Sequence, residues 1–138
     1  MSMSITPVYA GLIALVFVVL SFRVIGLRRK ARIGLGDGGN RSLMRRQRVH
    51  GNFAEYAPFV IVLMALAELQ GQSAWTIHLI DICLVVGRLL HAYGVGQEPE
   101  LAKLRVAGMA LTFTALISGA LSNLGLTGLM SLALASPS

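Results

Sequence analysis

Residues 45–58 read RRQRVHGNFAEYAP and run without a break into the apolar segment FVIVLMALA at 59–67. Polar side chains therefore stand at the start of a stretch whose composition suits lipid. Between Glu55 and Glu68 lie 12 uncharged residues, which rise about 18 Å as a helix, whereas the hydrocarbon core of a bilayer is about 30 Å thick. A helix that crosses the membrane here must include Glu55 or Glu68, and a glutamate inside a bilayer requires a partner.

The whole chain has the composition of an integral membrane protein. Of its 138 residues, 55% are hydrophobic and 13% are charged. The mean hydropathy is +0.71, which excludes an ordinary soluble domain. No charged residue occurs before Arg23 or after Arg105. We therefore predict an all-α integral membrane protein with a single domain over residues 1–138.

Four apolar segments are long enough to cross a bilayer as helices. We predict spans at about 7–26, 48–70, 75–93 and 101–134. A loop rich in Gly and Arg joins the first two spans, and short turns join the others. The predicted architecture is a four-helix transmembrane bundle.

Basic residues are concentrated in the first loop. Eight of the twelve Lys and Arg residues lie between Arg28 and Arg48, and the positive-inside rule places such a loop in the cytoplasm. Four spans then put both termini outside, in a multi-pass protein of the inner membrane if the source is bacterial. Next to membrane spans, a basic cluster indicates topology and contact with anionic lipid headgroups rather than with nucleic acid. Membrane lipids are therefore expected partners, and nucleic acid is not.

Two polar stripes interrupt the second and third spans. At helical spacing, the first consists of Arg48, Asn52, Glu55 and Tyr56, and the second of Arg88 and His91. Two interpretations are open. In the first, Glu55 and Arg88 form an ion pair between helices and only fix the packing. In the second, the stripes line a polar pocket near the cytoplasmic face, where an excess of arginine over acid favours an anionic ligand.

Other ionisable residues are assigned structural roles. Asp81 is expected to contact a neighbouring helix or the oligomer axis, and His78 to form a hydrogen bond between helices. Glu68 is expected at the outer interface, in contact with water. The single cysteine, Cys83, excludes an internal disulfide. The three histidines lack the spacing of metal ligands, so no metal site is expected.

The segment RVHGNFAEYAP at 48–58 resembles the second-helix signature of the MAPEG family, the membrane-associated proteins of eicosanoid and glutathione metabolism. GRLLHAYG at 87–94 resembles the third-helix part of that signature, and the chain length and four spans agree. The chain is thus similar to microsomal glutathione transferases and to the leukotriene synthase that conjugates glutathione, and we expect a bacterial member. The resemblance implies a homotrimer that binds glutathione between neighbouring subunits, near the cytoplasmic side.

The resemblance also implies which residues bind glutathione or a similar thiol. By position they are Arg48, His50, Asn52, Glu55, Tyr56, Arg88, His91 and a basic residue at the end of the first helix, Arg28 or Arg29. Arg105 is the counterpart of an arginine to which thiolate stabilisation is assigned in the leukotriene synthase, so it is the predicted catalytic residue. The chain departs from the family at Val95, where a tyrosine is common.

The implied function is a membrane-embedded glutathione-dependent transferase, or a peroxidase, acting on lipophilic small molecules that arrive from the bilayer. Glutathione carries two carboxylates and one ammonium, which the arginines and Glu55 complement in sign. A nearby guanidinium favours the thiolate, and each unit by which the pKa of the thiol falls is worth about 1.4 kcal/mol. The alternative is a non-catalytic lipid-binding or scaffold protein of the same fold. An exporter of lipophilic cations would carry an acid in its first span, and this chain has none there.

Overall fold

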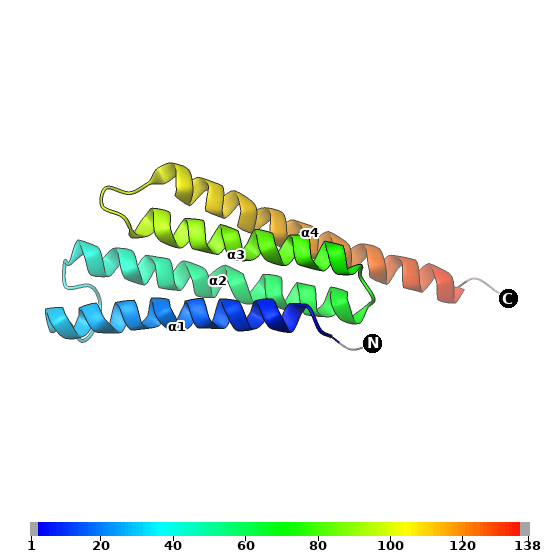
Figure 1. Cartoon of the computed structure of the whole chain (residues 1–138), viewed down its shortest axis with the longest axis horizontal. Helices are drawn as coiled ribbons and strands as arrows, with labels where there is room; N and C mark the ends of the chain where they lie inside the picture. The colour runs from blue at the N-terminus through cyan, green and yellow to red at the C-terminus, as the bar shows by residue number, and fades with distance from the viewer. Residues whose placement is uncertain (1–2, 136–138) are drawn as a thin grey trace.

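The computed structural model describes residues 3–135, with side chains described as far as Gly125. Four antiparallel helices lie side by side (Figure 1). They are α1 (Thr6–Ala31), α2 (Arg41–Leu69), α3 (Ala74–Gly96) and α4 (Ala102–Ala135). Within the described residues there is no strand, and all four helices are long and apolar enough to cross a membrane. The prediction of an all-α membrane bundle is confirmed.

The two ends of the bundle differ in what they carry. The start of α1 and the end of α4 lie at one end, together with the turn between α2 and α3 (Figure 1). The loops at 32–40 and 97–101 lie at the other end (Figure 1). Most of the basic residues therefore gather at the end that is remote from the termini, which we call the basic end.

The helices at the basic end are longer than the apolar segments that predicted them. α1 continues to its cap at Arg32, whose φ is 55°. α2 begins at Arg41, inside the predicted loop, because the side chain of Asn40 accepts a hydrogen bond from the backbone N–H of Leu43 at 3.0 Å. The first loop is thereby shortened to 32–40. Apolarity marks only the part of a helix that lies in hydrocarbon, and the helix continues into water where straight-chain residues and a cap favour it.

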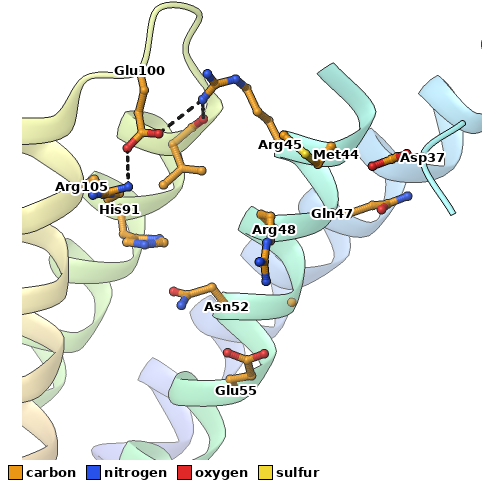
Figure 2. A pocket seen from close by; sticks show the side chains of 12 residues that line it. Asp37, Met44, Arg45, Gln47, Arg48, Asn52, Glu55, His91, Glu100 and Arg105 are labelled. Atoms are coloured by element: carbon orange, nitrogen blue, oxygen red, sulfur yellow. Dashed lines mark hydrogen bonds and ion pairs between the residues drawn. The ribbon is translucent and has the colours of Figure 1, made fainter. Parts of the chain in front are cut away.

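α2 packs against all three other helices and buries one continuous stripe. From Val49 onward the buried residues recur every three or four positions, and they are Val49, Phe53, Ala57, Val60, Met64 and Ala67. Ile13 of α1 and Ile77 and Leu84 of α3 pack against this stripe. Burial of the stripe fixes the rotation of α2, so the polar face that starts at Arg48 turns toward the α3–α4 pair (Figure 2).

α3 and α4 meet backbone to backbone at Gly87 and Gly108. A Cβ atom on Gly108 would lie 2.5 Å from the backbone N of His91 and 2.6 Å from the carbonyl O of Gly87. A Cβ atom on Gly94 would lie 2.7 Å from the backbone N of Arg105. Side chains larger than hydrogen do not fit at these crossings, and the close approach holds His91 and Arg105 at a fixed separation.

Glu68 ties α2 to the start of α1 at the end opposite the basic loops. α1 has no side-chain cap from its own N-cap residue. The Glu68 carboxylate accepts backbone N–H bonds from Ser4 and Ile5 at 2.7 Å and from Thr6 at 2.8 Å. A carboxylate at this position complements the positive end of the helix dipole. Glu68 was predicted at the outer interface in contact with water; the structure leaves it partly exposed at that end and adds that its carboxylate caps a neighbouring helix.

Two polar residues of α3 lie away from the basic end. Nδ1 of His78 and the hydroxyl of Tyr9 are 2.8 Å apart, so the predicted hydrogen bond between helices is confirmed. Asp81 is fully buried, and neither of its carboxylate oxygens has a hydrogen-bond partner among the described residues. Because Asp81 is enclosed within one chain, it does not lie on a surface that a symmetry axis could meet.

Candidate functional site

A cavity of about 760 Å³ opens at the basic end of the bundle. The first half of α2 forms one wall, and the end of α3 with the start of α4 forms the other (Figure 2). The lining residues are Asp37, Met44, Arg45, Gln47, Arg48, Gly51, Asn52, Glu55, His91, Val95, Glu100 and Arg105. Sites for small molecules commonly have volumes of about 300–1,000 Å³, so the volume of this cavity suits a ligand of that class.

Five of the predicted site residues line this cavity, namely Arg48, Asn52, Glu55, His91 and Arg105. Asn52 and Glu55 point from α2 into the space in front of α3 and α4 (Figure 2). The ion pairs within the described residues do not include Glu55. The interpretation in which Glu55 and Arg88 neutralise each other between helices is therefore wrong.

Arg88 lies behind the cavity wall. Its side chain is 1% exposed. Its Nη1 donates to Oδ1 of Asn52 at 2.7 Å, and its Nη2 and Nε donate to Oγ1 of Thr112 at 2.7 and 2.9 Å. Arg88 is not a lining residue, and it reaches the cavity only through Asn52. It is a buried cation whose described partners are all uncharged, so its positive charge adds to the potential inside the cavity.

Tyr56 also lies behind the wall. Cζ of Arg88 sits 5.5 Å from the centroid of its ring, within cation–π range. The ring of Phe113 on α4 approaches it edge-on, with centroids 5.6 Å apart. Tyr56 therefore contacts the guanidinium of Arg88 and contributes to holding it in place.

Two predicted ligands, His50 and Arg28, lie elsewhere. Nε2 of His50 is 3.0 Å from Oγ of Ser21, and its ring stacks on Phe17 with centroids 4.5 Å apart, so it faces α1. Nη1 of Arg28 donates to the carbonyl of Gly36 at 2.9 Å and holds the first loop. Neither residue lines the cavity of this single chain.

Two lining residues outside the predicted set, Arg45 and Glu100, form ion pairs at the mouth of the cavity. Oε1 of Glu100 lies 2.8 Å from Nη1 of Arg105, and its Oε2 lies 3.4 Å from Nη1 of Arg45. Both contacts are drawn in Figure 2. The spacing from Arg45 to Arg48 and Asn52 is also helical, so periodicity alone could have found Arg45. Glu100 could not be found in this way, because it lies in the turn between α3 and α4 and not on a helix.

Opposite charges are balanced along the lining. The cations are Arg45, Arg48 and Arg105, and the acids are Asp37, Glu55 and Glu100. The predicted excess of arginine over acid is therefore absent from the lining. The excess comes instead from the buried Arg88 behind the wall.

A second hollow of about 460 Å³ adjoins the polar cavity. Asn52, His91 and Arg105 line both spaces. The remaining lining of the second hollow is apolar and belongs to α4, from Val106 to Phe113. An ionic group and an apolar group could therefore meet at Arg105.

This arrangement has the elements needed to bind a zwitterionic, net anionic molecule. Arginine donates paired hydrogen bonds to carboxylates, and the free carboxylate of Glu55 is a partner for an ammonium. Asn52 is held by Arg88, so its amide is oriented before a ligand arrives. The guanidinium of Arg105 stands where charge on a bound nucleophile would be stabilised.

Comparison with known proteins agrees with the helical signatures. The MAPEG family model matches residues 6–125, which include both polar stripes and the start of α4. The inner membrane protein YecN of Escherichia coli strain K12 is 41% identical over 120 residues, which cover 87% of this chain and 90% of that protein. YecN of Escherichia coli O6:H1 is similar to the same extent. The similarity thus extends across all four helices.

Proposed function

The chain belongs to the MAPEG family of membrane proteins, and on this premise we propose that it is a membrane-embedded, glutathione-dependent transferase for lipophilic electrophiles. One observation carries the proposal: Arg105 lines both the polar cavity and the apolar hollow beside it. A charged thiol peptide and a lipophilic molecule can therefore be brought together at one guanidinium. A peroxidase that uses glutathione as reductant would use the same two spaces.

The charges of the cavity support glutathione as the thiol. Its two carboxylates suit Arg48 and Arg45. Its ammonium suits Glu55, a lining acid of α2 that takes part in no ion pair within the described residues. The side-chain amide of Asn52 can form hydrogen bonds with the peptide groups of the ligand. Another low-molecular-weight thiol with the same charges would be bound by the same residues.

The chemistry assigned to Arg105 is stabilisation of the thiolate. A guanidinium next to the sulfur lowers the pKa of the thiol, so the proton leaves to water and the sulfur keeps its electron pair. The thiolate then attacks an electrophilic carbon of the lipophilic substrate in the hollow along α4. The new carbon–sulfur bond forms as the leaving group departs with its electrons, or as the electrons move into a conjugated acceptor.

We further propose a homotrimer in an inner membrane, with the basic end in the cytoplasm and both termini outside. The positive-inside rule supports this orientation, and the name of the inner membrane relatives supports the location. Large apolar side chains on the outer face of α1, including Leu15, Val19 and Phe22, are exposed in the single chain. Neighbouring subunits and lipid would cover them.

Glutathione binding to the purified protein in detergent tests the proposal. Arg48→Ala and Glu55→Gln should each weaken the affinity by about tenfold or more, because each removes a charge-assisted hydrogen bond. Arg41→Ala and Glu98→Gln are the matched controls, since both residues are exposed and outside the cavity lining. Wild-type affinity in both test variants would exclude the cavity as the thiol site.

A lipid-binding or scaffold protein without turnover is the second candidate. One observation favours it: the guanidinium of Arg105 is paired with Glu100 at 2.8 Å, which reduces its effect on a thiol. Ultraviolet difference spectroscopy of bound glutathione separates the two functions. A transferase should give a thiolate band near neutral pH that Arg105→Ala abolishes. A scaffold should give no band, and no conjugation of a generic aryl halide.

A further inference from the structure

Glu100 connects the two walls of the cavity at its mouth. One carboxylate oxygen contacts Arg105 of α4 at 2.8 Å, and the other contacts Arg45 of α2 at 3.4 Å. Nη1 of Arg45 also donates to the carbonyl of Val95 at 3.3 Å. Figure 2 shows Glu100 reaching between the two guanidinium groups from the α3–α4 turn.

The turn holds Glu100 in this place. The backbone N–H of Leu101 donates to the carbonyl of Gly94 at 3.1 Å, which closes the turn. Gly94 in turn packs against the backbone of Arg105 so closely that a Cβ atom would lie 2.7 Å from its N. Glu100 and Arg105 are therefore presented to each other by rigid backbone on both sides.

We propose that Glu100 occupies the anion position of the cavity, so that an anionic ligand must displace it from Arg45 and Arg105. This inference rests on the proposed function for the identity of the ligand. Under that function the thiol peptide brings a carboxylate to Arg45 and a thiolate to Arg105, and both are anions that compete with the carboxylate of Glu100. With Glu100 in place the lining is balanced in charge, and with Glu100 released its two arginines are unpaired. Glu100 thereby determines how many anionic groups the site accepts and how strongly.

Displacing Glu100 from the two arginines requires little free energy because the ion pairs are partly exposed. The side chains of Arg45, Glu100 and Arg105 are 18%, 26% and 49% exposed, and ion pairs in such positions are weak. The contact with Arg45 is also long for a charge-assisted hydrogen bond. Removal of the competing carboxylate should therefore tighten binding by about two- to fivefold. A purely structural clamp predicts the reverse, since its loss would let Arg105 move and weaken binding.

The first arm of the test requires no ligand. The rates at which phenylglyoxal modifies Arg45 and Arg105 are measured by mass spectrometry in wild type, Glu100→Gln and Glu98→Gln. Gln keeps the size of the side chain and removes its charge, and Glu98 is an exposed acid of the same turn. We expect both arginines to react faster in Glu100→Gln only. Unchanged rates would overturn the proposal whether or not glutathione binds.

The second arm measures affinity with two probes, glutathione and the simple dicarboxylate glutarate. Protection of Arg45 and Arg105 from phenylglyoxal reports the binding of each probe. We expect both to bind about two- to fivefold tighter to Glu100→Gln than to wild type or Glu98→Gln. Equal or weaker binding of both probes would overturn the proposal. If glutarate follows the expectation and glutathione does not bind at all, the thiol assignment fails while the role of Glu100 stands.

Discussion

Nη1 of Arg88 donates a hydrogen bond to Oδ1 of Asn52 at 2.7 Å, so a fully buried cation on α3 sets the orientation of a side chain in the cavity wall on α2. The rest of the guanidinium is fixed by Thr112 of α4. One side chain thus joins three helices just behind the site. Arg88 is a positioning residue for Asn52 and a source of positive potential, and it does not line the cavity itself.

Arg88→Met should weaken glutathione binding by about tenfold, because Asn52 loses the donor that orients it and the site loses a nearby positive charge. Arg88→Lys should recover part of this loss, since an ammonium restores the charge but cannot reproduce the planar fork that reaches Asn52 and Thr112 together. Isothermal titration of the folded variants in detergent measures both effects. Arg41→Met, at an exposed arginine outside the cavity lining, is the control. Wild-type affinity in Arg88→Met would contradict the assigned role.

Gly108→Ala should destabilise the bundle by about 1–3 kcal/mol, because the new methyl group would press on the backbone of α3 at Gly87 and His91. The measurement is thermal unfolding in detergent, followed by circular dichroism. Gly11→Ala is the matched change on α1, where nothing lies within 4 Å of the new atom. It should leave the midpoint unchanged or raise it. Equal midpoints for the two variants would show that α3 and α4 are not packed as closely as described.

Glu68→Ala should release the start of α1, because the backbone N–H groups of residues 4–6 lose their acceptor. Amide hydrogen exchange at these residues should accelerate at least about tenfold, and the bundle should lose about 1–3 kcal/mol. Exchange rates read by mass spectrometry on N-terminal peptides provide the test. Glu98→Ala, at the opposite end, should leave these peptides as they are in wild type.

Tyr9→Phe should cost about 0.5–1.5 kcal/mol, since it removes the hydroxyl that bonds His78 while keeping the ring in place. Tyr93→Phe, at an exposed tyrosine of α3, should be neutral. Unfolding midpoints of the two variants in the same detergent give the comparison. A neutral Tyr9→Phe would mean that the bond adds nothing to the stability of the bundle.

Much of the fold and part of the site could be predicted from the sequence. Apolar length alone located the four helices, and helical spacing alone placed Arg48, Asn52 and Glu55 on one face. The same spacing turns His50 about 200° away from Arg48 around the helix. Helical spacing could therefore have predicted that His50 faces another helix rather than the cavity. His50 was included among the predicted ligands because of the family resemblance and not because of helix geometry.

The remaining features depend on contacts between segments that are distant in sequence. The rotation of α3 decides that Arg88 points behind the wall, and packing at Gly87 sets that rotation. The shape of the α3–α4 turn brings Glu100 to Arg45. The spacing of residues along the sequence does not predict this contact, because the two residues belong to different segments. The start of α2 at Arg41 was also not predicted. The segment before residue 48 is rich in glycine and arginine and was predicted to be a loop, whereas Asn40 caps a helix there.

The cap that Glu68 places on α1 has a consequence for membrane insertion. α1 starts with backbone amide groups that have no acceptor within the helix, and the carboxylate that accepts their hydrogen bonds is synthesised 62 to 64 residues later. The depth at which α1 finally sits is therefore set by the far end of α2. A shift in the depth of either helix would therefore be transmitted to the other through this cap.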